Sequence, residues 1–260
     1  MKRDRIEQIF SYIKEHENAS TLELAEFFNV SEMTIRRDLA ALEAHGRISR
    51  FYGGAVAKQT TPSEDAFALR VGMNQKYKTA IGLRAARYLR EQLEHKGECP
   101  VFLGSGSSIF LMAQQLTEAL PVPIITDNLH VASALSCNPD NSVIIIGGTI
   151  LLPSLNATGY LAEKMLADLS VEYAFIGSSG IDENGYLCAY NLVETGMFST
   201  IISTSRQVII LADHSKIGRS NMVRIQALSE KFTLISDQLA PEACMEHYRG
   251  MGARVIQVDC

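Results

Sequence analysis

The sequence predicts an α/β protein in which a small helical module precedes a larger domain built on a parallel sheet. Apolar residues recur at helical spacing up to about residue 45. Beyond residue 100, short apolar runs alternate with helical stretches. Continuous apolar strands between helices are typical of a parallel sheet covered on both faces. We therefore expect a module at residues 1–57, a linker at 58–69 and a second domain at 70–260.

Three helices are expected in the module. The apolar residues within 6–13 are spaced i, i+3, i+4, i+7, which predicts the first helix. Ser20 and Glu23 have the spacing of a capping box and begin the second. Ser31 is an N-cap candidate for the third, in which the apolar residues within 35–42 share one face. These three faces can close a small trihelical core.

The opposite face of the third helix is typical of a DNA-recognition helix. Its first turns carry short polar side chains and guanidiniums, and arginine can pair bidentately with guanine in the major groove. A hairpin of Ile48–Phe51 and Ala55–Val56 follows around Gly53-Gly54 and completes a winged helix-turn-helix. An ordinary solvated helix face is the alternative interpretation. The residues expected to contact DNA are Ser20, Thr21, Ser31, Glu32, Met33, Thr34, Arg36, Arg37, Arg47, Arg50 and Tyr52.

These N-terminal residues closely resemble the DNA-binding module of DeoR-family bacterial transcription regulators. The matching residues are Arg5, Ile9 and Ile13, the run from Ser31 to Leu39, and Tyr52-Gly-Gly-Ala55. The resemblance covers residues 3 to about 58. It implies binding to a double-stranded DNA operator, with Ser31 to Arg37 in the major groove. It also implies a homo-oligomer, at least a dimer and often a tetramer.

Charge gives the module little overall attraction for DNA. Residues 1–58 carry nine Lys and Arg against nine Asp and Glu, and the whole chain has a formal net charge of −5. DNA contact must therefore rest on local clusters of arginine. We expect weak non-specific binding and two modules acting together.

Composition favours a cytoplasmic protein without a metal or a cofactor. The chain has no apolar run long enough to span a bilayer, and its first residues lack the apolar stretch of a signal peptide. The five cysteines include no C-x-x-C pair, which favours reduced thiols over a disulfide framework or a zinc site. The histidines have no recognised metal-ligand spacing.

The second domain is expected to begin with a helix at about residues 77–93 and to contain seven strands. The expected strands are Val101–Leu103, Ile124–Thr126, Val143–Ile146, Tyr173–Ile176, Val208–Ala212, Phe232–Ile235 and Val255–Val258. In such sheets, ligands sit beyond the carboxyl ends of the strands. Five strand ends here carry small or polar residues.

The glycine- and serine-rich loop after the first strand leads directly into a helix, and free amides at a helix N-terminus can hold a phosphate. Each strand end alone could be an ordinary tight turn, but together they favour a small-molecule pocket. The candidate ligand-binding residues at these ends are Gly104, Ser105, Gly106, Ser107, Ser108, Asp127, Asn128, Gly147, Gly148, Gly177, Ser178, Asp182, Asp213 and Lys216.

This half also resembles the C-terminal sensor domain of the DeoR family. The matching runs include GSGSS, TDN, FIGSSGID, NLVE and ADHSKIG. The resemblance implies a fold related to sugar-phosphate isomerases and coenzyme A transferases, used to sense phosphorylated sugars or related metabolites. It implies Lys78 as a further pocket residue, and the NLVE run adds Asn191 and Glu194. Family members commonly carry an acidic residue where this chain has Gly104. The resemblance therefore leaves open which hydroxyl groups of the effector this protein would contact.

Two functions fit these features. The resemblance implies a repressor of a carbohydrate-utilisation operon, controlled allosterically by a phosphorylated sugar or sugar alcohol. The alternative is a sugar-phosphate isomerase, which needs a general base beside groups that stabilise an enediolate. Asp182, Glu183 and Glu194 are candidate bases and Lys216 a candidate cation, but residues 190–194 lack the glycine-rich, lysine-bearing segment of those isomerases. We therefore expect binding without turnover.

Overall fold

The computed structural model describes residues 2–16, 18–44, 47–51, 53–57, 67–96, 99–152 and 154–260. By internal packing the chain divides into two units, Met1–Ala66 and Phe67–Cys260. Tyr52 and residues 58–66 of the predicted linker lie outside the described residues. Each unit is described by itself below.

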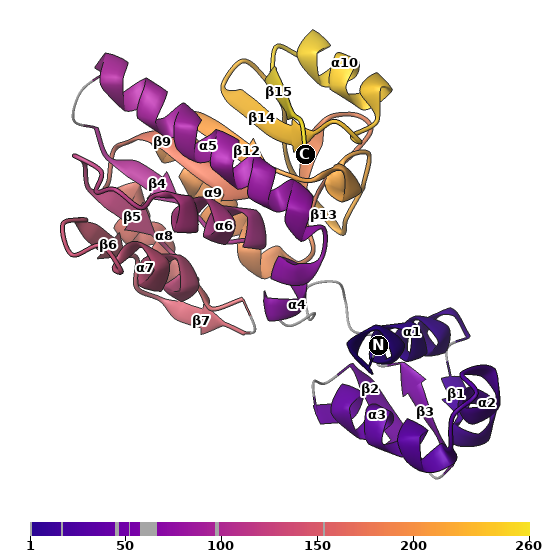
Figure 1. Ribbon diagram of the computed structural model, residues 1–260. Helices are drawn as coiled ribbons and strands as arrows, with labels where there is room; N and C mark the ends of the chain where they lie inside the picture. Colours follow the sequence, from indigo (N-terminus) through magenta and orange to yellow (C-terminus); the bar gives the residue numbers. More distant parts are fainter. Residues whose placement is uncertain are drawn as a thin grey trace. The chain divides into compact units, whose positions relative to one another are not determined.

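The first unit has the expected three helices and hairpin (Figure 1). In chain order its elements are α1 (Lys2–Glu15), β1 (Asn18–Ser20), α2 (Thr21–Phe27), α3 (Glu32–Ala44), β2 (Ile48–Phe51) and β3 (Gly54–Ala57). Strand β1 was not predicted. It pairs antiparallel with β3 in a sheet of order β1-β3-β2, so the hairpin is tied to the chain between α1 and α2.

The core of this unit comes from the predicted apolar faces. Its fully buried side chains include Ile9, Ile13, Leu24, Ile35, Leu39, Leu42 and Ile48. The capping box is confirmed, because the Ser20 hydroxyl accepts from the Glu23 amide at 3.1 Å and the Glu23 carboxylate accepts from the Ser20 amide at 3.3 Å. Between α2 and α3, Asn29 has φ of 50°, a left-handed conformation that asparagine adopts more readily than most residues.

The second unit is organised around a seven-stranded parallel sheet of order β15-β14-β12-β9-β4-β5-β6. All seven predicted strands are confirmed (Figure 1). They are β4 (Val101–Leu103), β5 (Ile124–Thr126), β6 (Val143–Ile145), β9 (Val171–Gly177), β12 (Ser205–Leu211), β14 (Phe232–Asp237) and β15 (Arg254–Val258).

Helices cover both faces of this sheet, as continuous apolar strands require. Along β9, Tyr173 and Phe175 pack into one core with α5 (Gln75–Lys96), α6 (Ser107–Gln115) and α7 (Leu129–Leu135). The alternate residues Ala174 and Ile176 pack into the other core with α8 (Tyr160–Ala167), α9 (Thr195–Thr204) and α10 (Glu242–Gly250). Helices α5 and α6 approach closely at Gly82, where an added Cβ would lie 2.8 Å from the Met112 amide nitrogen.

Several smaller elements were not predicted. Strands β7 (Thr149–Leu151) and β8 (Asn156–Thr158) form a hairpin, and β10 (Gly180–Ile181), β11 (Tyr186–Ala189) and β13 (Val223–Ala227) form a small antiparallel sheet. Two short 3₁₀ helices, η2 (Leu192–Glu194) and η3 (His214–Lys216), follow strand ends. Within the described residues, no helix is both long enough and apolar enough to cross a membrane.

The predicted linker of residues 58–69 is too long at its C-terminal end. Helix α4 (Phe67–Gly72) begins inside it. Phe67 is 8% exposed, stacks on the His130 ring with centroids 4.1 Å apart and meets the Phe110 ring edge-on. These ring contacts hold α4 against α6 and α7, so residues 67–69 belong to the second unit.

Candidate functional site

The first turns of α3 present the predicted recognition face. Ser31, Glu32, Met33, Arg36 and Arg37 are exposed, Met33 to 81%. The helix start is fixed by the Ser31 hydroxyl, which accepts from the Thr34 amide at 3.3 Å and lies 3.0 Å from the Thr34 hydroxyl. The exposed ion pair of Arg36 with Glu32, at 3.3 Å, holds that guanidinium only weakly. Both arginines can therefore reach another molecule.

Other predicted DNA-contact residues are built into the module. The Arg47 guanidinium donates to both oxygens of Glu7, at 2.6 and 3.0 Å, and lies 3.7 Å from the centre of the Phe10 ring. Only 12% of the Arg47 side chain is exposed. Thr21 is 5% exposed, whereas Ser20 serves as the cap of α2. These contacts give Arg47, Thr21 and Ser20 structural roles.

Arg50 of the wing is less confined. Its Nε lies 3.2 Å from the Glu43 carboxylate, and 42% of its side chain is exposed. An ion pair this exposed contributes little free energy, so the guanidinium can exchange Glu43 for a phosphate at small cost. Tyr52, the remaining predicted contact, lies outside the described residues.

The second unit has a small pocket at the carboxyl ends of the parallel strands, where the sequence places it. It has about 330 Å³ of unfilled space, part of it open to solvent. Five of its lining residues were predicted: Gly104, Ser105, Asp127, Gly177 and Glu194. The other five were missed: Asn156, Ile176, Met197, Phe198 and Ile201. The pocket therefore combines a polar rim from strand ends with an apolar wall from β9 and α9.

Two carboxylates with perturbed acidity face this pocket. Asp127 is 3% exposed, and burial raises its pKa to about 7, with a further contribution from the negative charge of Glu194. Burial also raises the pKa of Glu194, while the positive charge of Arg70 opposes that rise. Within the described part of the chain, Asp127 Oδ1 and Glu194 Oε2 are buried and have no hydrogen-bond partner. Each of these two oxygens is therefore an acceptor without a donor in the described part of the chain.

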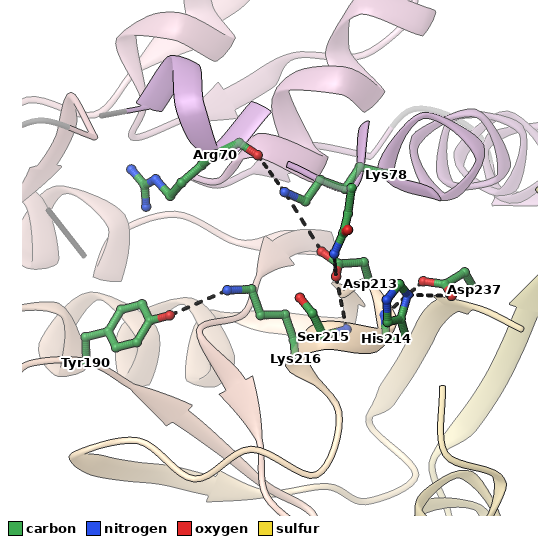
Figure 2. A network of polar contacts seen from close by, with 9 residues as sticks. Arg70, Lys78, Tyr190, Asp213, His214, Ser215, Lys216 and Asp237 are labelled. Atoms are coloured by element: carbon green, nitrogen blue, oxygen red, sulfur yellow. Dashed lines mark hydrogen bonds and ion pairs between the residues drawn. The ribbon is translucent and has the colours of Figure 1, made fainter. Parts of the chain in front are cut away.

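Arg70, Lys78 and Lys216 lie in the same region as Asp213, although the Arg70 guanidinium points away from it (Figure 2). The Lys78 ammonium donates to the Arg70 carbonyl at 2.6 Å and lies 3.9 Å from Asp213. Lys78 is only 5% exposed; burial lowers its pKa to about 8, Asp213 opposes that change, and the charges of Lys216 and Arg70 reinforce it. The three cationic side chains are therefore near enough to influence one another.

Asp213 is the anion that holds this cluster. Burial raises its pKa, but hydrogen bonds from Ser215 and Asn74 and the charge of Lys78 outweigh burial, so the pKa lies below its ordinary value. Lys216 extends past it toward Tyr190, with its ammonium 3.5 Å from the hydroxyl (Figure 2). No carboxylate of the described residues lies within ion-pair distance of Lys216. The cluster therefore carries more positive than negative charge, which suits an anion.

The loop before α6 adds backbone donors. Gly106 is the N-cap residue with φ of 126°, a conformation that side-chain-bearing residues rarely adopt. No side chain caps the helix, so the first-turn amides beside Ser107 and Ser108 have no capping acceptor. Such a helix start favours an anion.

The remaining predicted effector residues serve local structure. Asn128 caps α7, Asn191 caps η2, and Ser178 bridges both backbone groups of Gly180. Asp182 accepts from the Asn184 and Tyr186 amides and pairs with Arg224 at 2.9 Å. Gly147 and Gly148 are exposed and do not line the pocket. Among the described residues, no group of three or more His, Cys, Asp or Glu side chains could hold a metal ion.

Comparisons with known proteins match both units. Residues 5–61 match the DeoR-like helix-turn-helix domain, and residues 73–238 match the DeoR C terminal sensor domain. The chain is similar to the Glycerol-3-phosphate regulon repressor of Escherichia coli, with 30% identity over 92% of each chain. It is also similar to the uncharacterized HTH-type transcriptional regulator YulB of Bacillus subtilis, with 32% identity over 90% of this chain and 88% of that one.

Among solved structures, the chain is similar to ribose 5 phosphate isomerase A from Neisseria gonorrhoeae. The identity is 13% and the TM-score 0.37, over 55% of this chain and 53% of that one. A likeness of this size carries no conclusion about activity.

Proposed function

Because the chain belongs to the DeoR family of transcription regulators, we propose that it represses a carbohydrate-utilisation operon and responds to a phosphorylated sugar or sugar alcohol. The chain is a DNA-binding regulator and not an enzyme, so the isomerase alternative is dropped. One relative is by name a repressor of a glycerol-3-phosphate regulon, which supports both the sign of control and the class of effector.

The observation that carries the effector proposal is the arrangement at the strand ends of the second unit. A small pocket there lies on the same edge of the sheet as an uncapped helix start and a cluster of three cations. In this proposal the phosphate binds to Ser105–Ser108, with Lys78 or Lys216 nearby. Phosphate oxygens can accept hydrogen bonds from hydroxyls, backbone amides and ammonium groups together.

On the DNA side, the α3 face of Ser31 to Arg37 enters the major groove. Arg36 and Arg37 supply the base contacts, whereas Arg50 meets the phosphate backbone. Because the module is nearly neutral, two modules of a homo-oligomer act together on two half-sites. Effector binding changes the spacing of the two recognition helices, and a typical coupling of ~1–3 kcal/mol weakens operator binding roughly 5–150-fold.

The test is binding of the full chain to labelled DNA from upstream of its own gene and from neighbouring operons. It is run at two salt concentrations, with and without glycerol 3-phosphate, ribose 5-phosphate, glucose 6-phosphate, fructose 6-phosphate and sorbitol 6-phosphate. We expect one fragment to bind specifically and in a salt-dependent manner, and one compound to weaken that binding. The repressor proposal would be withdrawn if no fragment bound in preference to unrelated DNA.

A further inference from the structure

The sensor pocket presents acceptor oxygens that have no hydrogen-bond donor among the described residues. Asp127 comes from the end of β5 and Glu194 from η2, and each has a buried carboxylate oxygen without a partner among the described residues. A buried polar atom without a hydrogen bond costs about 1–3 kcal/mol, so native structures leave few of them. Here both atoms belong to residues that line one pocket, which points to a ligand that donates hydrogen bonds to them.

The backbone around Asp127 is firmly held, so its side-chain position is set before a ligand arrives. The Ala157 amide donates to the Asp127 carbonyl at 2.7 Å, which joins β8 to the end of β5. The next residue, Asn128, caps α7 through its side-chain oxygen. The backbone that carries the Asp127 carboxylate is therefore held in place, and the side chain is 3% exposed.

One wall of the pocket is apolar. Ile176, Met197 and Ile201 contribute carbon to it. Gly104 has little room for a side chain, because an added Cβ would lie 3.1 Å from the Phe102 ring and 3.3 Å from the Phe175 carbonyl. Acceptors beside an apolar wall suit a polyol, whose hydroxyls donate while its carbon atoms pack against Met197 and Ile201.

Charge determines the orientation of the ligand in the pocket. An anionic group would be repelled by the two carboxylates, so the phosphate must lie toward Lys78 and Lys216. Neither lysine is among the charges that shift the pKa of Asp127 or Glu194, whereas Arg70 lowers the pKa of Glu194. Burial raises the pKa of Asp127 to about 7, so this carboxyl readily holds a proton when no effector is bound. That proton occupies the position that a hydroxyl hydrogen of the effector would take.

We propose that Asp127 and Glu194 determine effector specificity by accepting hydrogen bonds from hydroxyl groups at the end of the effector remote from its phosphate. This inference rests on the proposed effector-binding function. It assigns the pocket to a neutral polyhydroxylated chain or ring carrying one terminal phosphate, and it excludes a second anionic group at the opposite end.

The experiment measures the thermal unfolding of the full chain at pH 8 with four kinds of probe. The first three are inorganic phosphate, the five sugar and polyol phosphates used in the DNA assay, and 2-phosphoglycolate, which replaces the hydroxylated end by a carboxylate. The fourth is glucosamine 6-phosphate, which replaces one hydroxyl of glucose 6-phosphate by an ammonium group. The variants are Asp127→Asn and Glu194→Gln, which keep side-chain shape. The matched control is Glu246→Gln, which removes an exposed carboxylate of α10 that does not line the pocket.

We expect at least one hydroxylated phosphate to raise the Tm of the wild type and of Glu246→Gln more than inorganic phosphate does. Asp127→Asn and Glu194→Gln should bind that compound at least tenfold more weakly and keep the wild-type response to inorganic phosphate. Far-UV circular dichroism and operator binding report whether each variant is folded.

The inference is wrong if both variants keep the full response to the hydroxylated compound, if 2-phosphoglycolate binds as well as that compound, or if glucosamine 6-phosphate binds tenfold more tightly than glucose 6-phosphate. The last result would assign the carboxylates to an ammonium group. A wild-type protein that responds to no probe would instead remove the effector-binding function on which the inference rests.

Discussion

Replacing Asp127 with asparagine should stabilise the protein in the absence of effector. The folded state keeps a proton on this carboxyl up to a pKa of about 7, whereas the ordinary value is 3.8. The unfolded chain therefore releases its proton first, and stability falls as pH rises from about 4 to 7. The difference between these two pKa values, at ~1.4 kcal/mol per pH unit, corresponds to a loss of roughly 4 kcal/mol at pH 8. About 1.5 kcal/mol of that cost is already present at pH 5.

Asparagine carries no charge, so Asp127→Asn should avoid this cost. Its stability advantage over the wild type should grow by roughly 2–3 kcal/mol between pH 5 and pH 8. For a unit of this size, that is an increase of roughly 5–10 °C in the difference between the two Tm values. The assay is thermal unfolding followed by circular dichroism at both pH values. A variant no more stable than the wild type at pH 8, or an advantage independent of pH, would refute the reasoning.

Four further predictions concern the arginines and lysines. Arg37→Ala should weaken operator binding by about 1–3 kcal/mol in a mobility-shift assay. The control is Arg87→Ala, which removes an exposed arginine of α5. Equal losses of affinity in the two variants would contradict the recognition-helix assignment. Arg47→Ala should lower the free energy of unfolding of the first unit by about 1–2 kcal/mol, because it removes the Phe10 stacking and the Glu7 ion pair. An unchanged stability would contradict the structural role and favour Arg47 as a DNA-contact residue. Lys216→Ala should keep operator binding and lose the effector response; loss of DNA binding would indicate a structural role. Effector affinity measured by calorimetry should fall as pH rises through about 8, where Lys78 loses its proton. An affinity that does not change with pH in this range would show that Lys78 does not bind the phosphate.

The main elements of the fold could be predicted because their signals are local. Each central strand is a short apolar run bounded by polar turns, and the helices of the first unit show their spacing and caps. The missed strands depend on distant partners instead. Strand β10 has only two residues, whereas β13 of the same sheet shows the half-buried alternation Val223–Ala227 that a search for period two would have found. The first three residues of helix α4 were assigned to the linker because the contact that anchors them, the stacking of Phe67 on His130, joins residues far apart in the chain.

The site could be predicted only as a region. Glycine, serine and acidic residues after strands indicated the edge of the sheet where the pocket lies, but their sequence does not tell which side chain lines the pocket and which caps a helix. Asp127 lines the pocket, whereas the adjacent Asn128 bonds to the first amides of α7. Met197 and Ile201 have the spacing of ordinary core residues of a helix, and an apolar pocket wall has the same spacing.

The adjacency of Asp127 and Asn128 bears on how such a sensor can acquire a new effector in evolution. Asn128 fixes the start of α7 through the His130 and Val131 amides and holds the neighbouring loop through the Ser154 carbonyl. One oxygen of the neighbouring Asp127 side chain, by contrast, has no hydrogen-bond partner among the described residues. Substitutions there can alter what the pocket accepts while the helix and strand around it stay in place. Of these two neighbouring residues, Asn128 holds the local structure, whereas Asp127 can change with the effector that the pocket binds.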